Sequence, residues 1–120
     1  MQNNITIIPI IAQKYDKLKS LCAKYEVSTL YLFGSGTNEK FTEKSDLDFL
    51  VKFSEIPILD YADYFFDFMH ELEELYDRNI DLITEQSLTN PYLIKSINKN
   101  KKLIYARTNS EISAWYYNLN

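Results

Sequence analysis

Both glycines of the chain lie close in the sequence to a pair of aspartates. Residues of these types at this spacing could form a binding or catalytic site. Gly34 and Gly36 flank Ser35, directly after the apolar run STLYLF. Glycine allows a positive φ and lets a bulky anion approach the main chain. Successive N–H groups in such a turn form an anion-binding concavity. The same pattern is also typical of an ordinary tight loop, so it indicates a phosphate site only in combination with further residues.

The next feature is the tetrapeptide SDLD, which opens a second apolar run. Asp46 and Asp48 are two residues apart, so on a strand they share one face with Cα atoms about 6.5–7 Å apart. Aspartate is disfavoured in strands, and two neighbouring carboxylates repel each other. Such a pair suits a hard divalent cation, which takes oxygen ligands. A solvated edge face remains the alternative for this motif alone.

A third carboxylate, Asp81, interrupts the apolar run NIDLIT. If this strand lies beside DLDFLV, Asp81 converges with Asp46 and Asp48. Three such acids can hold two Mg²⁺ ions about 4 Å apart, the arrangement used for in-line phosphoryl displacement. Taken by itself, Asp81 could equally cap the end of a strand.

Apolar periodicity predicts the elements that position these residues. Strands alternate with helices, which indicates α+β (two-layer α/β) packing. The clearest helix follows Pro57, with an apolar stripe from Tyr61 to Tyr76. The predicted elements are a helix from Pro9 to about Tyr25, strands 28–33 and 46–53, helix 61–76, strand 79–84, a helix starting near Pro91 and strand 101–106.

Composition narrows the class of protein. With 120 residues, we expect one domain over 1–120, whose end, 105–120, either packs back or serves as a docking tail. The seven acids between 60 and 77 occur without Lys or Arg, and the chain lacks the broad basic surface of a stable nucleic-acid binder. No apolar run reaches the roughly 20 residues of a membrane span. A single cysteine and no signal-peptide pattern favour the cytoplasm.

Taken together, the motifs resemble a known family. Gly34-Ser35, nine residues, then Ser45-Asp46-Leu47-Asp48 and a later Ile80-Asp81-Leu82-Ile83 are similar to the nucleotidyltransferase pattern of the DNA polymerase β superfamily. The shortness of the chain matches the minimal nucleotidyltransferases, the MntA-type antitoxins. The resemblance covers about residues 20–105 and implies a small mixed sheet with helices packed on it.

The resemblance also implies roles for individual residues. Gly34, Ser35 and Ser45 would contact the nucleotide, while Asp46, Asp48 and Asp81 would hold two Mg²⁺ ions, with Asp81 helping to activate the attacking hydroxyl. Such proteins transfer AMP from ATP to a tyrosine hydroxyl of a helical HEPN-family toxin and thereby neutralise it. Self-association is left open.

One departure from the family pattern concerns the phosphate loop. Many members carry GSxxRG, whereas this chain has GSGTNE, with Asn38 and Glu39 in place of the arginine and the second glycine. Lys40 or Lys44 either replaces that charge or is an ordinary solvated lysine. The alternative function is therefore an inactive antitoxin that acts by steric binding. A transferase that modifies aminoglycosides or nucleic acids is disfavoured, because the chain has no room for a second, acceptor-binding domain.

Overall fold

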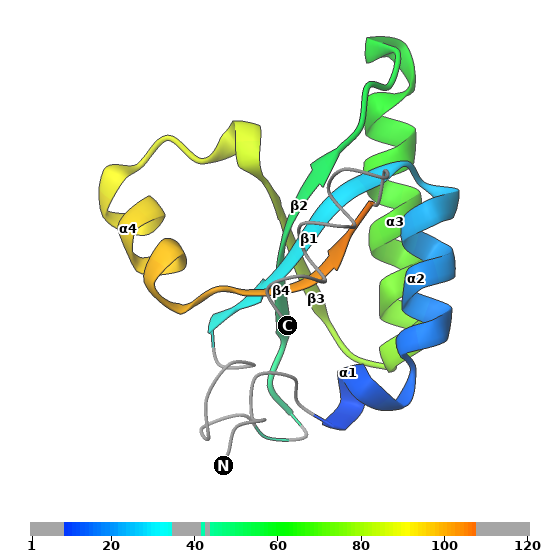
Figure 1. Ribbon diagram of the computed structural model, residues 1–120, viewed down its shortest axis with the longest axis horizontal. Helices are drawn as coiled ribbons and strands as arrows, with labels where there is room; N and C mark the ends of the chain where they lie inside the picture. The colour runs from blue at the N-terminus through cyan, green and yellow to red at the C-terminus, as the bar shows by residue number, and fades with distance from the viewer. Residues whose placement is uncertain (1–8, 35–41, 43, 108–120) are drawn as a thin grey trace, which may run out of the picture.

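A four-stranded mixed sheet with helices on both faces forms the structure, a computed structural model that describes residues 9–34, 42 and 44–107 (Figure 1). The elements are, in chain order, α1 (Pro9–Gln13), α2 (Tyr15–Lys24), β1 (Val27–Phe33), β2 (Leu47–Phe53), the 3₁₀ turn η3 (Ile58–Asp60), α3 (Tyr61–Tyr76), β3 (Ile80–Thr84), the 3₁₀ turn η4 (Glu85–Ser87), α4 (Pro91–Asn100) and β4 (Lys102–Ala106). The expected α+β class with a small mixed sheet is confirmed.

The strand order in the sheet is β3-β2-β1-β4. β1 runs antiparallel to both of its neighbours, whereas β2 and β3 are parallel and are joined through α3. The parallel register pairs Asp48 directly with Asp81. In the antiparallel register Asp48 also faces Phe33, the residue before Gly34. The ladder therefore brings all three sequence motifs to one end of the sheet.

Side-chain alternation divides the sheet into two faces. On β2 the residues Leu47, Phe49, Val51 and Phe53 are buried against the helical layer of α1, α2 and α3. Asp48 and Leu50 point to the other face, where Leu50 packs with Phe33 and with Ile97 of α4. Figure 1 shows α2 and α3 on one side of the sheet and α4 on the other.

Local signals explain where the helices begin and end. Asn90 caps α4, since its Oδ1 accepts hydrogen bonds from the N–H groups of Tyr92 (2.9 Å) and Leu93 (3.3 Å), and Pro91 follows at the first helical position. α3 ends at Asp77 in the left-handed conformation, with φ 51°. Among the described residues, no helix has the length and apolar character needed to span a membrane.

The helix predicted from Pro9 to Tyr25 is divided in two at Lys14. The Nζ atom of Lys14 donates a 2.6 Å hydrogen bond to the carbonyl oxygen of Leu75 in the last turn of α3. A lysine near a helix C-terminus satisfies carbonyls that have no partner within the helix. This hydrogen bond ties the N-terminal helices to α3.

Candidate functional site

The candidate site lies on the sheet face opposite α2 and α3, where β1, β2 and β3 meet. Asp48 and Asp81 are register partners on adjacent parallel strands, so their side chains project from the same face. Asp48 is half-buried, whereas Asp46 and Asp81 are exposed. Asp46 precedes the first residue of β2. Both strands deliver a carboxylate to this face because each carries one acid at an otherwise apolar, alternating position.

The surroundings of Asp48 disfavour the charged form of its carboxyl group. Partial burial, repulsion from Asp81 and Asp46, and a hydrogen bond with the Asp81 carboxyl raise the pKa of Asp48 to about 6. Crowded carboxylates favour the protonated form of one member. Across the described ranges, no three Asp, Glu, His or Cys side chains form a ready metal-binding cluster. The structure therefore pairs Asp48 with Asp81 on adjacent strands. Asp46 lies near them, but the three carboxylates do not form a closed cluster.

Gly34 borders the acid pair from the end of β1. Its φ is +72°, a conformation that side chains disfavour. A Cβ built at position 34 would lie 2.3 Å from Oδ2 of Asp48, so a side chain there would require the carboxylate to move. Both the backbone angle and the position of the carboxylate therefore favour glycine. Ser35, Gly36, Asn38, Glu39 and Lys40 fall outside the described residues.

Ser45 stands in the turn that leads into β2. Its Oγ accepts a 2.9 Å hydrogen bond from the N–H of Thr42, and its own N–H donates to the Thr42 carbonyl at 3.1 Å. The hydroxyl therefore closes the turn before Asp46. Its predicted contact with the nucleotide stays a prediction. Lys44 in this turn is exposed.

Sequence reasoning missed Arg78, between α3 and β3. Its Nη1 donates to the carbonyl oxygens of Ser45 (2.9 Å) and Thr42 (3.2 Å), and so holds the segment before Asp46 against the start of β3. Arg78 is a positioning residue, because both of these hydrogen bonds go to backbone atoms. In the sequence, Arg78 is notable only as the first basic residue after seven acids. This position does not indicate which residues Arg78 contacts.

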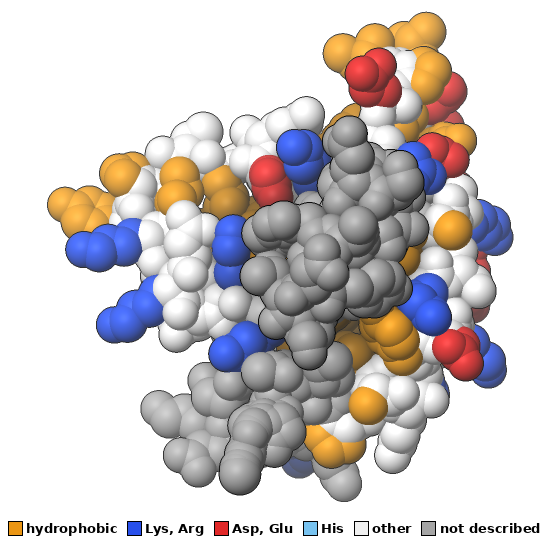
Figure 2. Space-filling model, viewed as in Figure 1, with side chains coloured by type: hydrophobic (Ala, Val, Ile, Leu, Met, Phe, Trp, Pro, Cys, Tyr) orange, Lys and Arg blue, Asp and Glu red, His pale blue; other side chains and the backbone are white. Residues whose placement is uncertain are grey.

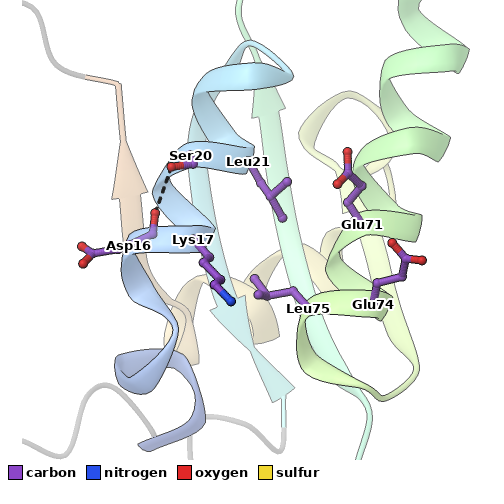
Figure 3. A pocket seen from close by; sticks show the side chains of 7 residues that line it. All are labelled: Asp16, Lys17, Ser20, Leu21, Glu71, Glu74 and Leu75. Atoms are coloured by element: carbon purple, nitrogen blue, oxygen red, sulfur yellow. Dashed lines mark hydrogen bonds between the residues drawn. The ribbon is translucent and has the colours of Figure 1, made fainter.

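Other residues singled out in the sequence lie away from this site. His70 is exposed, as expected of a surface histidine, and its Nδ1 lies 3.2 Å from Oε1 of Glu73. Cys22 is fully buried in the core. A groove of about 480 Å³ runs between α2 and α3. Figure 3 shows Leu21 and Leu75 at its centre and acidic side chains at its margin. This groove belongs to the helical layer and therefore to the opposite side of the sheet from the carboxylate pair.

Comparisons with known proteins agree with this geometry. The family model "Polymerase beta, Nucleotidyltransferase" matches residues 16–110. A Methanocaldococcus jannaschii protein named "Putative protein adenylyltransferase" is 40% identical over 101 residues, which is 84% of this chain and 96% of that protein. A solved structure described as "putative minimal nucleotidyltransferase" is 29% identical with a TM-score of 0.60, covering 77% of this chain and 90% of its own.

A more distant structure shares the fold. It contains a "tri-AMPylated Shewanella oneidensis HEPN toxin in complex with MNT antitoxin", and it is 17% identical with a TM-score of 0.52, covering 80% of this chain and 72% of its own. That likeness concerns the fold alone. The family model and the 40% identical relative each span most of the chain, and this protein belongs to the polymerase β nucleotidyltransferase family.

Proposed function

We propose that the protein is a Mg²⁺-dependent adenylyltransferase that moves AMP from ATP to a tyrosine hydroxyl of a HEPN-family toxin, for which it serves as antitoxin. The observation that carries the proposal is the carboxylate pair Asp48–Asp81 on adjacent parallel strands, directly against the backbone of Gly34. Membership of the nucleotidyltransferase family supports the reaction type. The curated relative, a named protein adenylyltransferase, supports AMP as the group transferred and a protein as the acceptor.

The donor set fits magnesium. Carboxylate oxygens are the ligands that this cation prefers, and the repulsion of the Asp48 carboxylate by Asp81 and Asp46 is the electrostatic condition that a bound cation would relieve. Asp48 and Asp81 would hold the metal, with Asp46 as the third ligand. When bound, Mg²⁺ neutralises charge on the phosphates and on the attacking and leaving oxygens.

The chain's own residues account for the remaining steps. Gly34 would contact the triphosphate through its main chain, and its missing Cβ leaves the space that the Asp48 carboxylate occupies. The acceptor oxygen attacks the α-phosphorus of ATP, the bond from that phosphorus to the bridging oxygen breaks, and pyrophosphate leaves. The hydroxyl proton passes to a carboxylate that acts as general base, and we assign this role to Asp81, which is exposed. Arg78 keeps the Asp46 segment in position through its two backbone hydrogen bonds.

The toxin partner is inferred from the solved relatives. The Shewanella complex joins an MNT antitoxin to an AMPylated HEPN toxin, and this chain shares its fold. We extend that pairing to the present protein, with a HEPN-type partner as the acceptor.

Label transfer from α-³²P-ATP tests the proposal. The protein is incubated with Mg²⁺ and the product of the neighbouring gene. We expect label on the partner, lost when Asp46→Asn and Asp48→Asn are combined. The matched control combines Asp63→Asn and Asp67→Asn, which removes the same charge from exposed positions of α3 and should keep full transfer. Unchanged transfer in the Asp46/Asp48 variant would contradict the proposal.

A second candidate follows from Asn38 and Glu39, which stand where many relatives carry an arginine and a glycine. In this case the protein neutralises its partner by covering it, without chemistry. A stable complex without label from any of the four nucleotides would favour this function. A carboxylate variant that binds the partner but no longer neutralises it would exclude it.

A further inference from the structure

The described chain ends at a firmly held point beside the end of β2. After β4, the N–H of Arg107 donates to the carbonyl oxygen of Ser28 at 2.7 Å. Its guanidinium donates to Oγ of Ser54 at 2.8 Å and to Oε1 of Glu26 at 2.9 Å. These three bonds fix where the following segment, 108–120, leaves the sheet. It leaves next to Ser54.

Ser54 is itself part of the wall of a cavity of about 600 Å³ between the end of β2 and the start of α3. Its lining is mainly apolar and also includes Glu55 and Gln86; the apolar lining residues are Phe53, Ile56, Ile58, Tyr61 and Ala62. Phe53 and Tyr61 stand edge to face, with ring centroids 5.4 Å apart. This volume lies in the range typical of ligand pockets.

Apolar surface beside this cavity is left in contact with water. Ile58, in its wall, is 87% exposed, and Leu59 next to it is 91% exposed. Figure 2 shows hydrophobic side chains gathered at this protruding end of the molecule, with acidic ones beside them. Exposed apolar surface that is contiguous, and not scattered over the molecule, is the kind that marks interaction sites.

The segment that starts here has the matching composition. Residues 113–119, SAWYYNL, carry no charge and include Trp115, Tyr116 and Tyr117. Seven residues lie between Arg107 and Trp115, and the eight Cα–Cα steps span up to about 26 Å when extended. A tether this short keeps its end at millimolar effective concentration around the attachment point. Aromatic side chains contribute large contact areas at low entropic cost.

We propose that residues 113–119 of the same chain dock in the β2–α3 cavity, with Trp115 as the anchor. The groove between α2 and α3 is a poorer site for this segment. Three carboxylates and Lys17 form its rim around Leu21 and Leu75 (Figure 3), whereas the β2–α3 cavity has one charged lining residue, Glu55. Covering charged groups with uncharged aromatic ones costs free energy. The inference does not depend on nucleotide transfer.

Trp115 is the only tryptophan, so intrinsic fluorescence of the full chain reports its surroundings. We expect emission at a shorter wavelength than that of the urea-unfolded chain, together with protection from acrylamide quenching. Ala62→Arg places a long charged side chain in the cavity from an exposed helical position. It should shift the emission to the unfolded-chain wavelength and increase quenching several-fold, while far-UV circular dichroism stays unchanged.

Two matched variants complete the experiment. Ala23→Arg makes the same exchange at an exposed position of α2 and should leave the emission as in the original chain. Ser20→Arg places the same side chain in the α2–α3 groove. Three results would overturn the proposal: a Trp115 that is already solvent-exposed, release by Ser20→Arg instead of Ala62→Arg, or protection that disappears on dilution and therefore comes from a second copy.

Discussion

Asp48 and Gly34 occupy adjoining space, and each limits what the other position tolerates. Because φ at Gly34 is +72°, Gly34→Ala should cost about 1–2 kcal/mol from the backbone alone. A further cost arises because the new Cβ would lie 2.3 Å from Oδ2 of Asp48. We expect a lowered urea midpoint and a displaced carboxylate.

A double-mutant cycle separates these two contributions. In an Asp48→Ala background the carboxylate is gone, and the Cβ of residue 48 lies at an ordinary 3.5 Å. Gly34→Ala should then cost only the backbone part. Equal costs in the two backgrounds would show that the Asp48 carboxylate does not exclude a side chain at position 34.

The raised pKa of Asp48 makes stability depend on pH. Between its ordinary value, 3.8, and about 6, the folded protein binds more protons at this carboxyl than the unfolded chain does. Stability contributed by this group therefore falls as pH rises through that window. We expect Asp48→Asn to be more stable than the original protein at pH 7.5, and this advantage to shrink by pH 4. Urea unfolding at both pH values measures it.

Asp67→Asn, at an exposed position of α3, serves as the control for removing one negative charge. Its effect on stability should change less between the two pH values. An advantage of Asp48→Asn that is identical at pH 4 and pH 7.5 would contradict the assignment of the shifted pKa to Asp48.

At the level of single residues, the sequence predicts the site where chemistry and spacing act together. Asp48 and Asp81 stand out because acids are rare inside apolar strands, and the structure pairs them. Arg78 does not stand out, since an arginine between a helix and a strand is ordinary. Its bonds to Ser45 and Thr42 depend on how β2 and β3 meet. Such long-range backbone contacts leave no local pattern.

Among the elements, α3 has an end that can be improved. Asp77 adopts φ 51°, which disfavours residues with a Cβ, and it places a negative charge at the negative end of the helix dipole. Asp77→Gly should therefore stabilise the protein by about 0.5–1 kcal/mol. Thermal unfolding at neutral pH is the measurement.

Asp77→Asn distinguishes the two causes, because asparagine removes the charge and keeps a side chain that tolerates the left-handed region. A gain for Asn equal to that for Gly would assign the effect to the charge. No gain for either would show that the helix end is not a weak point of the fold.

Periodicity predicts most elements because α3, β2 and β3 each bury one regular face. The apolar stripe from Tyr61 to Tyr76 coincides with α3. The division between α1 and α2 escapes such reasoning, since its spacing still reads as one helix. Lys14, at the break, makes a hydrogen bond to Leu75 in α3, and such a tertiary contact has no signal in the local spacing.

On the scale of the whole molecule, Cys22 offers a probe of global opening. It is fully buried between the helical layer and the sheet, and burial raises the pKa of its thiol well above the ordinary value. For a domain of ordinary stability, we expect a thiol reagent to modify the native protein at least about 10³-fold more slowly than the unfolded chain. The labelling rate should rise with urea as the protein unfolds.

The unfolded chain in concentrated urea at the same pH provides the reference rate. Fast labelling under conditions in which circular dichroism shows an intact fold would mean that the α2 region opens separately from the sheet.

The parallel pairing of β2 with β3 has a consequence for biosynthesis. Asp48 and Asp81 are separated in the chain by the whole of α3 and meet only once β3 has docked against β2. Contacts of this sequence separation form late, because a long loop must close first. A nascent chain from which β3, up to Thr84, has not yet emerged from the ribosome therefore contains Gly34 and Asp48 but cannot yet bring Asp81 against them. Catalytic competence would thus begin as a single late event, and its onset would report the docking of β3 against β2.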